Sequence, residues 1–123
     1  MGRPAMRGTF CILVIEEDPG LRELFYVLLE RYLPLLPETP REAQRLLTEV
    51  RYDLLILDED NGTLERRWGI QRQALGATLL IAPARPVDSR APNASPLLVL
   101  PKPFAIDELL HFVETIHAMW AAP

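Results

Sequence analysis

The chain has 123 residues, 49% of them hydrophobic, which is enough to bury the core of one domain. Its formal net charge of −4 argues against nucleic acid as the main partner. No apolar run approaches a membrane span of roughly 20 residues, no secretory signal opens the chain, and Cys11 is the only cysteine. We therefore expect a cytoplasmic protein without nucleic-acid or membrane partners.

The first predicted strand and helix follow a loose tail over residues 1–9. The apolar run at residues 11–15 has the length and β-rich composition of a buried strand. Asp18 followed by Pro19 predicts the start of a helix, because the aspartate side chain caps free amides and the proline needs no N–H there.

The middle of the chain predicts a weak strand, a helix and a strong strand. Pro34 ends the first helix and interrupts a short strand around residues 33–36, which we therefore expect at a sheet edge. Residues 39–42 form a capping box that starts the next helix. The apolar run at residues 53–57 predicts a buried strand that ends on Asp58.

The last third repeats the alternation with one interruption. A weaker helix is predicted over residues 64–75, strands over 78–82 and 97–100, and a final helix over 106–117. Residues 83–96 stand where a crossover helix is expected, but four prolines prevent a long regular helix. We expect a loop with at most one helical turn there.

This alternation predicts a single α/β domain over residues 10–120. The strand segments are apolar throughout, as in a parallel sheet covered by helices on both faces. Trp68 and Trp120 are interpreted as packing residues. His111 and His117 are six residues apart on one helix, which is not the spacing of a metal pair, so both are interpreted as surface or partly packed side chains.

Charged residues follow three of the predicted strands. Ligands of open parallel sheets bind beyond the carboxyl ends of the strands, which here carry Glu16, Glu17, Asp58 and Lys102. Carboxylates that converge need a cation, and oxygen ligands suit Mg²⁺. Lys102, the only lysine, adds a point charge for a phosphoryl oxygen. This set of groups suits the formation of an aspartyl phosphate.

Three segments in this order resemble the receiver domain of bacterial response regulators, the CheY-like fold. They are ILVIEEDPGLREL, YDLLILD and KPFAIDELL, and the resemblance covers about residues 10–118. It implies a three-layer α/β/α sandwich with a five-stranded parallel sheet in the order 2-1-3-4-5 and, in this chain, a reduced or missing fourth helix.

The resemblance also assigns roles to individual residues. Asp58 matches the phosphoacceptor, and Glu16 and Glu17 match the acidic pair that holds Mg²⁺. Asp60 matches the residue whose backbone carbonyl helps to hold the metal. Lys102 matches the lysine that contacts the phosphoryl group, and its bond to the following proline is expected to be cis.

Several positions depart from the family pattern. Glu17 stands where the family has aspartate and is longer by one C–C bond, so we expect weak Mg²⁺ binding. Ala82, or Pro83 in the neighbouring register, stands where the family has a serine or threonine that contacts the phosphoryl group, and Val99 replaces the aromatic switch residue. We therefore expect phosphorylation to change the molecule little beyond the loops near Asp58.

The resemblance implies an atypical single-domain response regulator of a two-component phosphorelay, not an enzyme. It would accept a phosphoryl group on Asp58 from a histidine kinase or phosphotransfer protein and signal to a downstream protein by direct contact. One alternative is a phosphorylation-independent pseudo-receiver that offers a fixed surface. A remote alternative is a haloacid-dehalogenase-like phosphatase, because residues 58–64 are similar to its motif apart from the extra Asn61.

Overall fold

The computed structural model of the chain describes residues 9–59, 64–70, 77–83 and 97–122. The predicted tail lies outside these ranges except for its last residue. The predictions for the proline-rich segment after Pro83 and for Asp60 also lie outside the described residues.

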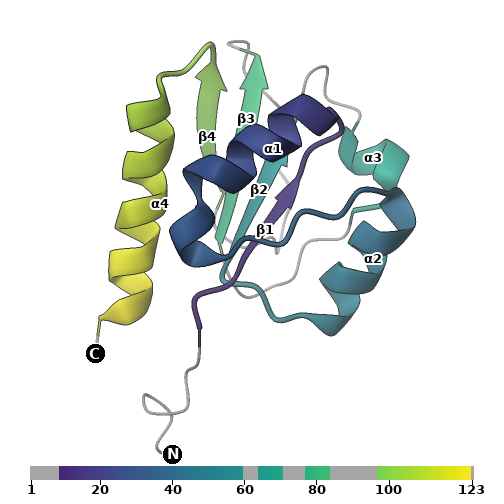
Figure 1. Cartoon of the computed structure of the whole chain (residues 1–123), viewed down its shortest axis with the longest axis horizontal. Coiled ribbons are helices and arrows are strands. Elements are labelled where there is room, and N and C mark those ends of the chain that lie inside the picture. The colour runs from purple at the N-terminus through teal and green to yellow at the C-terminus, as the bar shows by residue number, and fades with distance from the viewer. Residues whose placement is uncertain (1–8, 60–63, 71–76, 84–96, 123) are drawn as a thin grey trace, which may run out of the picture.

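A parallel sheet of four strands forms the centre of the molecule (Figure 1). The strands are β1 (Ile12–Ile15), β2 (Leu54–Asp58), β3 (Ala77–Pro83) and β4 (Leu97–Lys102), and they lie in the order β1-β2-β3-β4. All three pairings are parallel, so the predicted parallel α/β sheet is confirmed.

The prediction of five full strands needs a correction, because the strand expected at residues 33–36 is reduced to one bridge. Leu35 pairs with Leu13 of β1, in the place that the order 2-1-3-4-5 gives to the second strand. Its amide donates to the Ile12 carbonyl and its carbonyl accepts from the Val14 amide, both at 2.9 Å. The next residue in register to donate to β1 would be residue 37, and the ladder does not extend in that direction because Pro37 has no N–H.

The two helices of the first half begin as the sequence predicts. Helix α1 (Pro19–Leu28) is capped by Asp18, which accepts from the Gly20 amide at 2.7 Å. Helix α2 (Pro40–Glu49) is capped by Thr39. Helix α1 ends before Pro34, however, and a short 3-10 turn, η2 (Glu30–Tyr32), follows it.

The two helices of the second half differ in length from the prediction. Helix α3 (Leu64–Trp68) is shorter than expected because Gly69 follows it with a φ of 65°, a left-handed conformation that stops a helix. Helix α4 (Ile106–Ala121) is four residues longer than the predicted 106–117. None of the described helices has both the length and the apolar character that crossing a bilayer requires.

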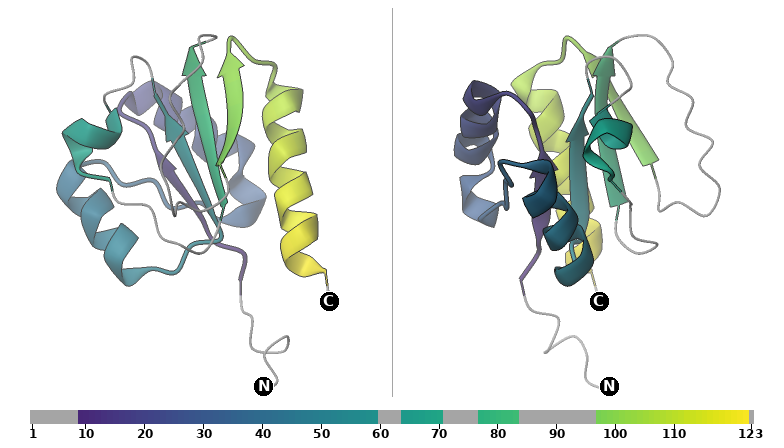
Figure 2. Two further views of the ribbon diagram at one scale, coloured as in Figure 1. Left: turned by 180° about the vertical axis from the view of Figure 1, so that it is seen from behind. Right: turned by 90° about the vertical axis from the view of Figure 1, so that its right-hand side faces the viewer.

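The helices cover the two faces of the sheet (Figure 2). Successive strand residues point to opposite faces, so each strand contributes to two cores. The core under α1 and α4 and the core under α2 and α3 take alternate residues of β1 and β2. On the first face are Ile12, Val14, Leu54 and Ile56; on the second are Leu13, Ile15, Leu55 and Leu57.

The aromatic residues pack as predicted. Trp68 is buried in the core under α2 and α3. Trp120 and His117 of α4 lie against Phe10, with ring centroids 5.2 and 5.0 Å from it, and fasten the end of this helix to the start of β1. His111 is exposed, so both histidines have the surface or partly packed placement that was predicted.

Substitution of Gly69 by alanine is expected to lower the free energy of unfolding by about 1–2 kcal/mol, the cost of a left-handed non-glycine residue. The added Cβ would also lie 2.7 Å from Gln44 Nε2, which donates to the Trp68 carbonyl. Urea unfolding of Gly69→Ala in the wild-type and Gln44→Ala backgrounds separates the two causes. Equal stability of Gly69→Ala and wild type would contradict the prediction.

Candidate functional site

Three charged side chains meet at the carboxyl ends of β1, β2 and β4. Glu16 directly follows β1, Asp58 ends β2 and Lys102 ends β4. Glu16 is two residues beyond Val14, and Asp58 is two beyond Ile56, so the alternation of the strands turns both carboxyl groups to the face covered by α1 and α4. The structure therefore brings together three of the site residues that the sequence predicted.

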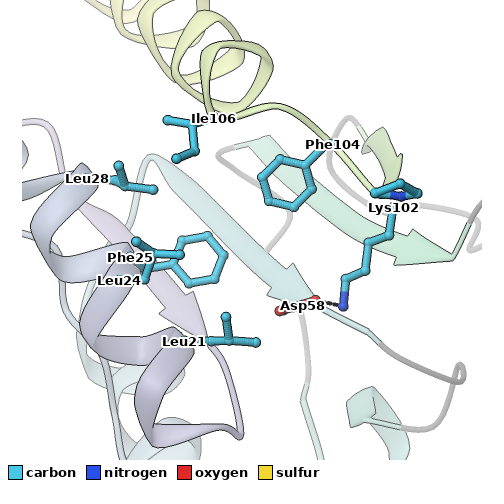
Figure 3. A pocket seen from close by; sticks show the side chains of 9 residues that line it. Leu21, Leu24, Phe25, Leu28, Asp58, Lys102, Phe104 and Ile106 are labelled. Carbon is cyan, nitrogen blue, oxygen red and sulfur yellow. Dashed lines mark ion pairs between the residues drawn. The ribbon is translucent and has the colours of Figure 1, made fainter.

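Lys102 points at Asp58 (Figure 3). Its ammonium Nζ forms an ion pair with Asp58 Oδ1, and the Asp58 side chain is only 5% exposed. The peptide bond between Lys102 and Pro103 is cis. Both the cis bond and the direction of the lysine are as the sequence predicted.

Glu16 lies beside Asp58 and is 3% exposed. Burial, together with a hydrogen bond to the Asp58 carboxyl, raises the pKa of Glu16 to about 8, although Lys102 opposes the shift. One oxygen, Oε2, accepts from the Asp18 amide at 2.9 Å, and the other is buried with no hydrogen-bond donor among the described residues. A protonated Glu16 resolves this, because it can donate to the Asp58 carboxylate.

Glu17 lies on the opposite face of the sheet, where it contacts α3. Its carboxylate accepts from both terminal nitrogens of Arg67, at 2.5 and 2.9 Å, and from Trp68 Nε1 at 3.4 Å. The hydrogen bonds from Arg67 lower the pKa of Glu17. The expected convergence of three carboxylates is therefore reduced to two among the described residues, because Arg67 and Trp68 of α3 hold the Glu17 carboxylate away from Asp58.

Glu59 is a buried acidic residue to which the sequence interpretation gave no separate role. It follows Asp58 as Glu17 follows Glu16, and it also faces α3. Its two carboxylate oxygens accept from the Leu64 and Glu65 amides at 2.9 and 2.8 Å, so it caps the first turn of that helix. The two-residue alternation of the strands was the signal that could have separated Glu59 from the site.

Only part of the predicted magnesium site lies within the described residues. Among them, no three His, Cys, Asp or Glu side chains are grouped as a metal ion requires. Glu17 is bound to Arg67, and Asp60 lies outside the described residues. The positive charge that faces Asp58 is the Lys102 ammonium.

The two altered switch positions lie on the strands beside the site. Val99 of β4 is 40% exposed and carries no aromatic ring that could turn inward. Ala82 pairs with Pro101 through the backbone of β3, and its side chain lies outside the described residues.

An apolar pocket of about 520 Å³ opens beside Asp58 and Lys102 (Figure 3). One wall is α1 and the other is the start of α4 with the connection before it. Its apolar lining residues are Leu21, Leu24, Phe25, Leu28, Pro103, Phe104 and Ile106. The leucines of α1 recur at helical spacing in the sequence, but a 3.6-residue periodicity cannot distinguish a face that packs in the core from one that lines a groove.

Stability is expected to depend on pH through Glu16. Between pH 4.5, the ordinary pKa, and about 8, the folded chain holds a proton on Glu16 that the unfolded chain has released. The free energy of unfolding therefore falls as pH rises through this range, by at most about 1.4 kcal/mol per pH unit, and this dependence ends above the folded pKa. Urea unfolding of wild type and Glu16→Gln from pH 5 to 8 measures the difference.

Glu17→Gln is the matched control. The pKa of Glu17 is lowered in the folded chain, so the stability that its charge contributes is lost only as pH falls below the ordinary pKa of a glutamate. The free energy of unfolding of Glu17→Gln should therefore change with pH in parallel with that of wild type from pH 5 to 8. If the free energy of unfolding of Glu16→Gln falls with pH as steeply as that of wild type, the assigned protonation of Glu16 is contradicted.

No family model matches the chain, and no curated protein matches its sequence. Solved structures do match its fold. The chain is similar to a CheY-like response regulator receiver domain from Methylobacillus flagellatus, with 17% identity, 89% of this chain and 99% of that chain covered, and a TM-score of 0.64. It is also similar to the non-phosphorylated HemR receiver domain from Leptospira biflexa, with 24% identity, 88% and 94% coverage, and a TM-score of 0.63.

A third match comes from the complex of the histidine kinase ThkA with the response regulator protein TrrA. It has 23% identity, covers 88% of this chain and 98% of that chain, and has a TM-score of 0.58. Each of the three matches covers 88% or 89% of this chain. The chain therefore has the fold of the CheY-like response regulator receiver domains.

Proposed function

We propose that the protein is an atypical receiver that accepts a phosphoryl group on Asp58 from a histidine kinase or phosphotransfer protein. The observation that carries the proposal is the contact between the Lys102 ammonium and the buried Asp58 carboxylate at the carboxyl edge of the sheet. A buried carboxylate at this edge is in a position to act as a nucleophile, and an adjacent ammonium compensates the charge of a transferred group. The kinase complex among the structures of similar fold supports the class of partner.

The transfer requires few groups of the protein. An Asp58 oxygen attacks the phosphorus of a phosphohistidine, a P–O bond forms, and the P–N bond breaks. The imidazole nitrogen leaves with the bonding electron pair and takes a proton from solvent. Lys102 has three donors and compensates the negative charge of a phosphoryl oxygen once the phosphorus is bonded to the Asp58 oxygen. Protonated Glu16 adds no negative charge to the pocket that receives the phosphoryl group.

The apolar pocket beside Asp58 suits a helix of the phosphodonor. Leu21 and Leu24 of α1 are 38% and 43% exposed, and Ile106 at the start of α4 is 46% exposed. An amphipathic helix that places apolar side chains between α1 and α4 would bring a histidine on the same helix to the Asp58 end of the pocket.

A phosphorylation-independent pseudo-receiver remains the alternative, favoured by the engagement of Glu17 with Arg67 away from Asp58. The phosphatase alternative loses support. Its motif normally follows the first strand of the sheet, whereas Asp58 ends β2.

Incubation of the chain with a small phosphodonor such as acetyl phosphate is expected to add one phosphoryl group to Asp58, detected by intact mass. Asp58→Asn should abolish the adduct, and Lys102→Ala should reduce its rate at least ten-fold, because one oriented charge contributes on the order of 10² in rate. Asp107→Asn, an exposed aspartate of α4, should leave it unchanged. A wild-type chain that stays unmodified while correctly folded would support the pseudo-receiver.

Leu24→Asp is expected to slow phosphoryl transfer from a phosphorylated phosphotransfer protein at least ten-fold, because a charge in the pocket opposes burial of the donor helix. It should leave modification by acetyl phosphate unchanged. Val27→Asp is the matched control, since Val27 lies on α1, is 59% exposed and does not line the pocket. Equal transfer rates for the two variants would remove the docking surface from the proposal.

A further inference from the structure

A second pocket opens at the amino ends of the strands, at the far end of the sheet from Asp58. Its volume of about 560 Å³ is within the range of small-molecule sites. One wall is α4, and the other is formed by the beginnings of β3 and β4 with the residue before β2. We call it the basal pocket. Its apolar lining residues are Ala77, Leu98, Phe112, Ile116, Met119 and Trp120.

The aromatic wall of the basal pocket is held in place by the packing behind it. The Trp120 ring stacks on His117 with ring centroids 5.6 Å apart, and its centroid lies 5.2 Å from that of Phe10. Phe10 is itself buried in the core. Met119 is 68% exposed, and its unbranched side chain can adapt to what it contacts. One fixed aromatic wall and one adaptable side chain suit a ligand that carries a flat apolar group.

The charge of the basal pocket comes from Asp53. The other polar lining residues are His111 and Thr115, and among the described residues that line the pocket none is a lysine or an arginine. Asp53 Oδ2 accepts from the Cys11 amide at 2.8 Å, whereas Oδ1 accepts no hydrogen bond from a described residue. The Asp53 backbone is fixed by hydrogen bonds to Cys11 and Ala77. The carboxylate is therefore held at the pocket with one oxygen available to a donor.

We propose that the basal pocket binds a small organic ammonium ion that carries an aromatic ring, with the ammonium paired to Asp53. The faces of Phe112 and Trp120 would add cation–π attraction to the ion pair. A neutral ligand would leave the Asp53 charge unpaired, and an anion would be repelled by it. The net charge of −4 favours the same choice. This inference is independent of phosphorylation, because Asp58 lies at the opposite end of β2.

Amide NMR titration of the isotope-labelled full chain with three probes of similar shape tests the proposal. The probes are phenethylammonium, phenethyl alcohol and phenylacetate, which are a cation, a neutral molecule and an anion. We expect chemical-shift changes at the Ala77 and Leu98 amides and at the Trp120 indole. The ammonium should bind about two- to five-fold more tightly than the alcohol, the range of one partly exposed ion pair, and phenylacetate most weakly.

Three outcomes of this titration would overturn the proposal. One is equal affinity for the ammonium and the alcohol, which would make the pocket merely apolar. Another is a set of chemical-shift changes that leaves out the lining residues of the basal pocket. The third is a change of the same resonances with protein concentration alone, which would assign the pocket to a second copy of the chain.

Two pairs of variants test the role of Asp53. Asp53→Asn removes the charge but keeps an oxygen that can accept from the Cys11 amide, and it should lose the preference for the ammonium over the alcohol. Asp107→Asn, at an exposed aspartate in the first turn of α4, is the matched control and should keep that preference. Thr115→Lys should bind the ammonium about two- to five-fold more weakly than Thr115→Gln, because it adds a like charge to the pocket. An unchanged preference in Asp53→Asn, or equal affinities of the two Thr115 variants, would contradict the proposal.

Discussion

The alternation of side chains along buried parallel strands is the constraint on which the rest of this structure depends. Because helices cover both faces of the sheet, consecutive residues of β1 and β2 enter two different cores. The same alternation continues into the first residues beyond each strand. It therefore determines which charged residues meet at the carboxyl edge and which hold a helix behind it.

The electrostatics of the site follow from this separation. Two carboxyl groups, Glu16 and Asp58, are buried side by side, which is unfavourable if both are charged. The Lys102 ammonium pairs with Asp58, and burial together with the Asp58 carboxyl raises the pKa of Glu16 to about 8, so the repulsion between the two carboxyl groups is reduced. Glu17 keeps its charge because Arg67 pairs with it on the other face.

The pocket between α1 and α4 places an apolar surface directly beside the charged residues of the site. Its walls are apolar side chains, and its one polar end holds Asp58 and Lys102. Part of the α1 surface is therefore apolar and accessible. The residues that form it continue the apolar stripe of α1, whose other members pack in the core. In the proposed function, a donor helix seated there would exclude water from Asp58.

The sequence by itself determined the architecture, because long apolar strands, capping residues and prolines act locally. Asp18 and Thr39 cap the helices as predicted, and the three strong apolar runs after the first form β2, β3 and β4. The sequence also predicted that Glu16, Asp58 and Lys102 lie close together, because parallel strands bring their carboxyl ends to one edge of the sheet. The position of each residue at the end of an apolar strand segment was enough for this prediction.

Only the tertiary structure decided which acidic residues share a face and what each one contacts. Arg67 is fifty positions from Glu17, and no local pattern predicts that α3 turns this arginine toward the end of β1. The reduction of the second strand to Leu35 and the end of α3 at Gly69 were likewise decided by backbone conformation. The physical reason is that hydrogen bonds and ion pairs between distant segments form only after the sheet has fixed the distances and directions of the side chains.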